Sequence, residues 1–347
     1  MAGSEENMRK IVLGIDGSEH CERALEWYVK NLSNKKTDKL FIIHAQEPPT
    51  IPAAPYPYGY AYYEEWQHLL QKSDKHAKEL LECFGAKCNH HELKFKLYKE
   101  ESNRPGEVIC KLAKDEGADI ILIGSRGVGT LRRTFLGSVS DYCVHHTHIP
   151  VVVIPPQDSH ESNSHVKCVT LIVERGTSSF WPRPNVKVNM TAEASECTAR
   201  KILIAVDGSE HGYMEKIHSA GDSVIVLHAF EIPSLPYSSG PFVFAYYEEW
   251  SEMVNGLREQ AKEMMLGYEL RCKEKKLHYE MILIAGKPAG NVICSEAKTQ
   301  KVDLVITGCR GLSKARRTIL GSVSDYVVHH SGLPVCVVPP PLKKHDQ

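Results

Sequence analysis

The 347-residue sequence contains no apolar run long enough to cross a bilayer, because a membrane-spanning helix needs about 20 consecutive apolar residues. It also lacks an excess of either charge: 42 Lys and Arg residues stand against 43 Asp and Glu residues, so the formal net charge is -1. Without a basic surface field, nothing attracts nucleic acid or an anionic membrane over long range. We therefore expect neither nucleic acid nor membrane among the partners.

Cysteine-pairing motifs are missing as well. The 11 cysteines are odd in number, contain no Cys-x-x-Cys pair and lie in apolar stretches such as Val108–Cys110. This distribution is typical of reduced cysteines in a protein core. The first residues show no secretory pattern. We expect a cytoplasmic protein.

Several enzyme and metal signatures are absent too. The sequence has neither Gly-x-x-x-x-Gly-Lys-Ser/Thr nor Gly-x-Ser-x-Gly, the loops of P-loop proteins and α/β-hydrolases. His145-His146 and His329-His330 are adjacent pairs. Adjacent helical residues point in different directions, so we expect surface or capping roles and no metal site.

What the sequence does contain is a tandem repeat. Corresponding residues of the last shared motif lie 184 positions apart, and the repeated unit covers about 150 residues, the size of a complete domain. We expect one domain at residues 8–156, a mobile polar linker at 157–199 with one strand-like run at 168–173, and a second domain at 200–340. The shared motifs are Ile15–His20 with Val206–His211, Ala61–Trp66 with Ala245–Trp250, and Leu136–Tyr142 with Leu320–Tyr326.

Short apolar strands alternate with helical segments in each copy. This alternation predicts an α/β fold in which a parallel sheet is covered by helices on both faces and ligands bind at the carboxyl ends of the strands. In the first copy the expected strands are 10–15, 40–44, 94–98, 118–123 and 150–154, and the expected helices begin near residues 18, 62, 105 and 138.

The second copy has a shorter first helix. Only 21 positions separate Asp207 from His228, whereas 28 separate Asp16 from His44. The missing seven residues are close to two helical turns, so the shortened helix covers less of its sheet. We expect the second domain to be the less stable one.

A glycine motif after the fourth strand is the sharpest functional signal. Nine residues separate its second and third glycines in both copies. Glycines let backbone N–H groups approach a phosphate, and the following helix N-terminus adds donors and a favourable dipole. The motif consists of Gly124, Ser125, Arg126, Gly127, Gly137 and Ser138 in the first copy, and of Gly308, Cys309, Arg310, Gly311, Gly321 and Ser322 in the second.

The same residues have a simpler interpretation. Ser138 with Asp141 and Ser322 with Asp325 fit a capping box at a helix start. We favour phosphate binding because the spacing is kept although the loop interior differs. Arg132, Arg133, Arg316 and Arg317 also lie in this loop and could screen a phosphate chain.

The end of the first strand carries Asp16 in one copy and Asp207 in the other. Each carboxylate could contact a ribose or an adenine edge, or only form an Asx-turn that starts the next helix. The sequence leaves these two interpretations equal. For His44 and His228, at the end of the second strand, we expect ordinary strand-end roles.

At these motifs the chain resembles the universal stress protein family, in which Gly-x-x-Gly, nine residues and Gly-Ser/Thr mark ATP-binding members. The resemblance implies two Rossmann-like domains of the adenine nucleotide alpha hydrolase type, each with five parallel strands in the order 3-2-1-4-5. It also implies pairing through the last strands, 151–154 and 335–338. The implied nucleotide-binding residues are Asp16, Ala45, Gly124, Arg126, Gly127, Gly137, Ser138, Val139 and Ser140 in the first copy, and Asp207, Ala229, Gly308, Arg310, Gly311, Gly321, Ser322, Val323 and Ser324 in the second.

These features predict an ATP-binding regulator or sensor in the stress response. We expect it to hold ATP with Mg²⁺, to act through an unidentified protein partner, and to pair its domains within one chain or in a homo-oligomer. No catalytic base can be assigned, so any ATPase activity should be slow. If one site is occupied, we expect the first. The alternatives are an adenylyl-transferring enzyme on the same fold and an interaction scaffold that binds no nucleotide.

Overall fold

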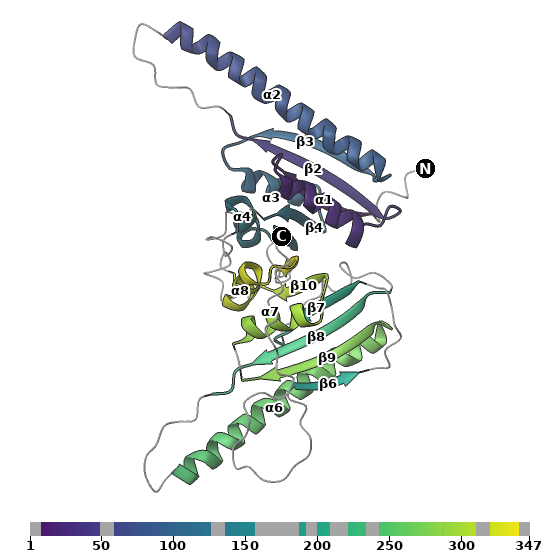
Figure 1. The fold of residues 1–347 in the computed structure, drawn as a ribbon, viewed down its shortest axis with the longest axis vertical. Helices are drawn as coiled ribbons and strands as arrows, with labels where there is room; N and C mark the ends of the chain where they lie inside the picture. Colours follow the sequence, from purple (N-terminus) through teal and green to yellow (C-terminus); the bar gives the residue numbers. More distant parts are fainter. Residues whose placement is uncertain are drawn as a thin grey trace.

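The computed structural model describes residues 8–48, 59–125, 136–156, 187–191, 200–208, 221–233, 243–286, 288–309 and 320–339. Within these residues the strands form an 11-stranded sheet in the order β3-β2-β1-β4-β5-β11-β10-β7-β8-β9-β6. Figure 1 shows the two halves of this sheet meeting at the middle of the molecule. The sequence repeat is therefore a structural repeat.

Each repeat forms one module of alternating strands and helices. The first contains β1 (Arg9–Ile15), α1 (Glu19–Asn31), β2 (Asp38–Gln46), α2 (Gly59–His90), β3 (Phe95–Glu101), α3 (Pro105–Asp115), β4 (Ile120–Gly124), α4 (Ser138–His146) and β5 (Val151–Ile154). The second contains β7 (Lys201–Ala205), β8 (Ser223–Phe230), α6 (Val243–Glu274), β9 (His278–Ala285), α7 (Ala289–Thr299), β10 (Leu304–Gly308), α8 (Ser322–His330) and β11 (Val335–Val338).

The predicted strand order is confirmed in both modules. The first module has the order β3-β2-β1-β4-β5 and the second the matching order β9-β8-β7-β10-β11, with parallel pairing throughout each set. β1 lies between β2 and β4: Ile11 is in register with Leu40 on one side and with Ile120 on the other. The carboxyl ends of β1, β2 and β4 consequently meet at one edge, where a ligand site is expected.

The two modules join through their last strands. β5 pairs with β11 in antiparallel fashion, with Val153 in register with Val335 and Val151 with Val337. This is the intramolecular pairing that the family resemblance implies. All four side chains are almost fully buried, so the junction is apolar and continuous with the core of both modules.

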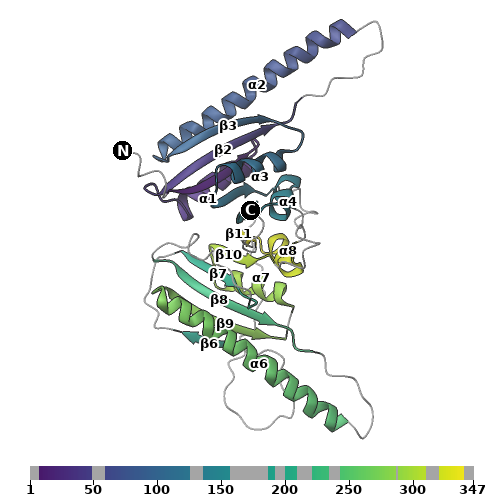
Figure 2. The ribbon, with the colours of Figure 1, turned by 180° about the vertical axis from the view of Figure 1, so that it is seen from behind.

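Successive residues of a strand pack against two different helix layers, one on each face of the sheet. Leu13 belongs to the apolar cluster that includes Leu25 of α1 and Phe84 of α2. Val12 belongs to the cluster that includes Ile109 of α3 and Cys143 of α4. Figures 1 and 2 show α2 and α6 at the two far ends of the molecule, each running beyond the strands on which it packs.

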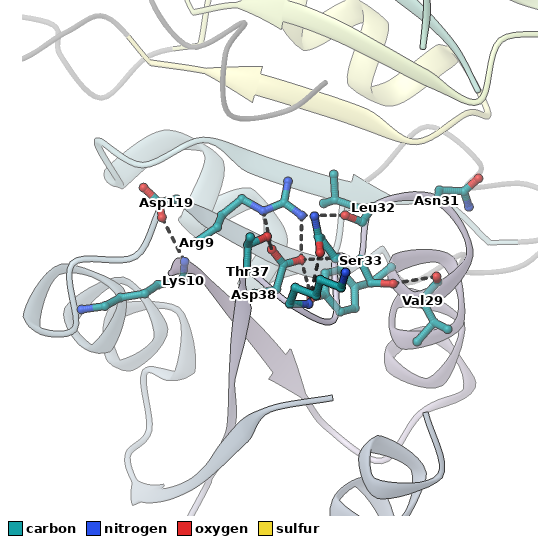
Figure 3. A network of polar contacts seen from close by, with 12 residues as sticks. Arg9, Lys10, Val29, Asn31, Leu32, Ser33, Thr37, Asp38 and Asp119 are labelled. Atoms are coloured by element: carbon teal, nitrogen blue, oxygen red, sulfur yellow. Dashed lines mark hydrogen bonds and ion pairs between the residues drawn. The ribbon is translucent and has the colours of Figure 1, made fainter. Parts of the chain in front are cut away.

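An ion pair with a buried carboxylate fixes the start of the first module (Figure 3). Asp38 is 3% exposed and accepts hydrogen bonds from Arg9 Nε at 3.0 Å and Arg9 Nη2 at 2.6 Å. The Tyr28 hydroxyl donates to the same carboxylate at 2.9 Å, and the Asn34 N–H donates at 2.8 Å. The pair ties the beginning of β2 to β1 and to α1.

Helix α1 is held from both modules at its C-terminal end. Arg9 Nη2 donates to the Leu32 carbonyl at 2.6 Å, and Arg200, its counterpart before β7, donates from Nη1 to the Asn31 carbonyl. Arg200 also pairs with Asp222, as Arg9 does with Asp38. A cation near the last carbonyls of a helix is favourable, so α1 receives this stabilisation twice.

Two segments differ from the sequence-based expectations. Helix α2 begins at Gly59, three residues before the expected start near residue 62, and ends at His90, two residues before Glu92 takes a left-handed φ of 57°. The expected linker contains a strand, β6 (Lys187–Thr191), which pairs antiparallel with β9. The strand-like run at 168–173 and the shortened helix after Asp207 lie outside the described residues.

Nine described cysteines are free thiols, and most are buried as expected, although Cys83 is exposed. Among the residues that the structure describes, no helix is both long and apolar enough to span a membrane.

Candidate nucleotide site

A cavity of about 760 Å³ opens at the carboxyl ends of β1, β2 and β4 in the first module. Ligand sites for small molecules usually have volumes of about 300 to 1,000 Å³, so its size suits a nucleotide. The cavity brings together predicted residues that are more than 120 positions apart in the sequence. Those that line it are Asp16, Ala45, Gly124, Gly137, Ser138, Val139 and Ser140.

The start of α4 forms one wall of this cavity. Gly137 is the N-cap with extended backbone (φ -66°, ψ 149°), and Ser138 is the first helical residue. The N–H groups of the first turn have no partner within the helix, and the helix dipole favours an anion at this position. The arrangement can therefore bind phosphate oxygens.

The capping-box interpretation of Ser138 is wrong. The N-cap residue is Gly137 and not Ser138, and no side-chain hydrogen bond caps the helix there. Ser138 is exposed on the first turn. Ser140 instead donates from its hydroxyl to the Gly137 carbonyl at 2.9 Å. The second module repeats this contact between Ser324 and Gly321, also at 2.9 Å.

Gly124 has a packing reason to be glycine. A Cβ at this position would lie 2.4 Å from the His20 carbonyl oxygen and 2.6 Å from its carbon. The first turn of α1 thus packs directly against the end of β4, which brings two walls of the cavity together. The predicted partners Arg126 and Gly127 lie outside the described residues, as do Arg310 and Gly311.

Asp16 forms the turn between β1 and α1. Its Oδ1 accepts bonds from the Ser18 N–H at 3.0 Å and from the Ser18 hydroxyl at 2.5 Å, while Gly17 takes a φ of 78°. This is the Asx-turn, one of the two interpretations of Asp16 that the sequence left equal. Asp16 is also exposed at the cavity, so a nucleotide contact stays a prediction.

His44 and His228 have the same structural role in the two modules. His44 Nδ1 lies 3.0 Å from the Ile15 carbonyl, and His228 Nδ1 lies 2.7 Å from the Val206 carbonyl. Each bond joins the end of the second strand of its module to the end of the first. Each histidine therefore joins two strand ends at the cavity of its module, which is a strand-end role.

Several residues at the cavity were not predicted. Gln46, at the end of β2, contacts Ser73 of α2, and Arg104 precedes α3 as an exposed cation paired with Glu107 at 2.9 Å. Burial raises the pKa of Cys21, whose thiol lies 3.0 Å from the Ser18 carbonyl. A protonated thiol is a poor nucleophile, so Cys21 serves in packing.

The corresponding cavity of the second module is much smaller, at about 90 Å³. This volume is below the usual range for small-molecule sites. The predicted residues that it brings together are Asp207, Ala229, Gly308, Gly321, Ser322, Val323 and Ser324. Gly208 there takes a φ of 88°, like Gly17 in the first module.

No group of three or more candidate metal ligands occurs among His, Cys, Asp and Glu of the described residues.

Comparison with known proteins gives the same organisation. A universal stress protein of Mycobacterium tuberculosis is 24% identical over 338 residues, covering 94% of this chain and 96% of that protein. A universal stress protein A-like protein of Arabidopsis thaliana is 30% identical over 136 residues, which cover 39% of this chain and 77% of that protein.

One solved structure shares the fold over almost the whole chain, and a second solved structure is similar in sequence to part of it. A universal stress protein from Archaeoglobus fulgidus superposes with a TM-score of 0.55 at 17% identity, over 97% of this chain and 99% of that one. An Arabidopsis thaliana family protein solved with AMP bound is 26% identical, with a TM-score of 0.33, and covers 43% of this chain and 93% of its own. The family model for universal stress proteins matches residues 7–155 and 198–339. The chain belongs to the universal stress protein family and carries two tandem domains of that family.

Proposed function

We propose that the first module binds ATP with Mg²⁺ and that nucleotide occupancy regulates the association of the chain with a protein partner in the stress response. One observation carries this proposal: a single cavity of about 760 Å³ gathers the strand-end residues and the α4 N-terminus. The adenosine would lie at Asp16 and Ala45, and the phosphates at Gly137 and Ser138. The chain would act from the cytoplasm.

Mg²⁺ fits this arrangement as an ion delivered with the triphosphate. Magnesium usually keeps several waters and binds substrate phosphates with few protein ligands, and no cluster of three candidate ligand side chains lies among the described residues. The α4 N-terminus would hold the phosphate oxygens, and the Ser138 hydroxyl is exposed beside them. We propose binding rather than fast hydrolysis, because hydrolysis needs a base beside the terminal phosphate, and Asp16, the carboxylate assigned to the nucleotide, would lie at the adenosine instead.

A charge placed at the start of α4 tests the proposal. Ser138→Asp should weaken Mg²⁺-ATP binding by about tenfold or more, because two like charges at 4 Å repel by several kcal/mol near a protein surface. The same aspartate should not unfold the module, since an acidic residue in the first helical turn is favourable by about 0.3 to 1 kcal/mol. Isothermal titration of the intact chain gives both affinity and stoichiometry.

Ser322→Asp is the matched control in the second module. It should leave the affinity unchanged and the stoichiometry at one nucleotide per chain, because the second cavity is only about 90 Å³. Two nucleotides per chain would contradict single-site binding. If Mg²⁺-ATP gives no heat in the titration and does not raise the melting temperature of the intact chain, nucleotide binding is contradicted and the interaction scaffold that binds no nucleotide is the remaining alternative.

A further inference from the structure

Helices α3 and α4 pack closely against each other beside the cavity of the first module (Figures 1 and 2). A Cβ at Gly106 of α3 would lie 2.7 to 2.9 Å from atoms of Tyr142 of α4, and both residues line the cavity. The residue after Tyr142 is Cys143, whose Sγ lies 3.8 Å from the Gly106 carbonyl oxygen. The close packing at Gly106 therefore brings a thiol of α4 to the backbone of α3.

A second thiol lies at the same contact. Cys110 is one helical turn after Gly106, on the same face of α3, and its thiol is hydrogen-bonded to that of Cys143. Both cysteines are free thiols. Cys143 is 0% exposed, whereas Cys110 is only partly buried. Two sulfur atoms from neighbouring helices thus meet, and one of the two residues is open in part to solvent.

The two thiols differ in acidity. The hydrogen bond with Cys143 lowers the pKa of Cys110, although burial by itself would raise it. The hydrogen bond with Cys110, and then burial, raise the pKa of Cys143. The thiolate is the reactive form of cysteine. Cys110 is therefore the nucleophile of the pair, and Cys143 keeps its proton.

We propose that Cys110 and Cys143 form a redox modification site, at which a hydroperoxide oxidises the pair to a disulfide that links α3 to α4. In the first step the Cys110 sulfur attacks the peroxide. An S–O bond forms, the O–O bond breaks, and the departing oxygen leaves as water or an alcohol with the proton that Cys110 releases. The product is a sulfenic acid at Cys110.

In the second step the Cys143 sulfur attacks the sulfenic acid. An S–S bond forms, the S–O bond breaks, and the hydroxyl leaves as water with the Cys143 proton. The pair loses two electrons in total, and the peroxide gains them. The hydrogen bond with Cys110 and the Cys110 charge contribute to the raised pKa of Cys143, and an uncharged sulfenic acid removes the charge. Cys143 therefore becomes a better nucleophile once Cys110 has reacted.

The second module has the same helix packing with one of the two thiols replaced. A Cβ at Gly290 of α7 would lie 2.6 Å from the Tyr326 ring of α8. Cys294 of α7 is at the position of the α3 cysteine, but Val327 of α8 stands where α4 has Cys143. Burial raises the pKa of Cys294. This module therefore provides an internal comparison for the reactivity of the pair.

The test treats the intact, reduced chain with hydrogen peroxide at neutral pH. The reaction is stopped with acid, the remaining thiols are alkylated, and the chain is digested without reductant for mass spectrometry. We expect a linked pair of peptides that contain Cys110 and Cys143, two hydrogens lighter than the reduced peptides and absent after treatment with dithiothreitol. The Cys110 thiol should be lost about tenfold or more faster than the Cys294 thiol, because its thiolate fraction is larger.

Cys143→Val separates the two steps. It places the valine of the second module in α4, where the same helix packing accommodates it, so the fold should be kept. Cys110 should then stop at the sulfenic acid, which dimedone traps, and no linked peptide should form. Cys294→Ala is the matched control and should leave the link between Cys110 and Cys143 unchanged.

Two results would overturn the proposal. One is a folded chain that gives no linked peptide, or gives it only in urea. The other is a Cys110 sulfenic acid that persists in the unmodified chain while Cys143 stays a thiol. The comparison of Cys110 with Cys294 needs no variant, so it stands even if Cys143→Val unfolds. Because the readout is a covalent bond, the result does not depend on whether the chain binds a nucleotide.

Discussion

Replacing Asp38 with alanine should lower the free energy of unfolding by about 3 to 5 kcal/mol, the usual cost of removing one partner from a buried ion pair. Asp38 is 3% exposed, and its carboxylate accepts hydrogen bonds from Arg9, Tyr28 and Asn34. Its loss would remove the carboxylate that contacts the Arg9 guanidinium at 2.6 Å, and the Arg9 side chain is only 16% exposed. Urea unfolding of the intact chain, followed by circular dichroism, measures the change.

Tyr28→Phe is the control for this prediction. It removes one hydrogen bond to the carboxylate and keeps the ion pair, so it should cost less than Asp38→Ala, about 1.5 to 3 kcal/mol. Burial, and then the Asp38 charge, raise the pKa of Tyr28 well above its usual value. The contribution of its hydroxyl should therefore be constant at neutral pH and decline only above the unfolded pKa of about 10. Equal losses in the two variants would contradict a dominant role for the ion pair.

Gly124→Ala should destabilise the first module by about 1 to 3 kcal/mol, the usual cost of overpacking, and by more if α1 cannot move. The new Cβ would meet backbone atoms of His20 at 2.4 and 2.6 Å, and backbone yields less readily than a flexible side chain. Because the start of α1 also carries Ser18 and Cys21 at the cavity, a displaced helix should weaken nucleotide binding as well. Thermal melts and ATP titrations of one preparation measure both effects.

Gly267→Ala is a control of opposite sign. Gly267 lies inside α6, and a Cβ there would meet nothing within 4 Å. Alanine in an open helical position should stabilise the chain by about 0.5 to 1 kcal/mol. If Gly124→Ala proves as harmless as Gly267→Ala, the close contact between α1 and β4 is not rigid.

The sheet could be predicted because its strands are apolar on both faces. Runs such as Ile120–Gly124 can only lie between two helix layers, and such strands joined by helices fix a parallel arrangement. Strand β6 was missed because it is a short stretch in a polar segment and lacks such an apolar run. It becomes a strand by pairing with the open side of β9. Local sequence does not reveal such a partner.

The site could be predicted only in part. The start of α4 was found from Gly137 and Ser138, but the capping box was wrong because the N-cap is Gly137 and the bonding hydroxyl belongs to Ser140. The contact between Gln46 and Ser73 joins residues 27 positions apart on different elements, which no periodicity predicts. One signal was present in the sequence: the copies differ at this position, with Gln46 in one and Phe230 in the other.

The antiparallel contact between β5 and β11 also determines how the assembly responds to dilution. Both strands belong to one polypeptide, so their encounter is intramolecular and has an effective concentration set by the connecting chain rather than by the amount of protein present. Two separate modules joined by the same contact would dissociate when protein becomes scarce. In this chain the two modules stay paired at any protein concentration, so a ligand that binds one module always binds it with the other module beside it.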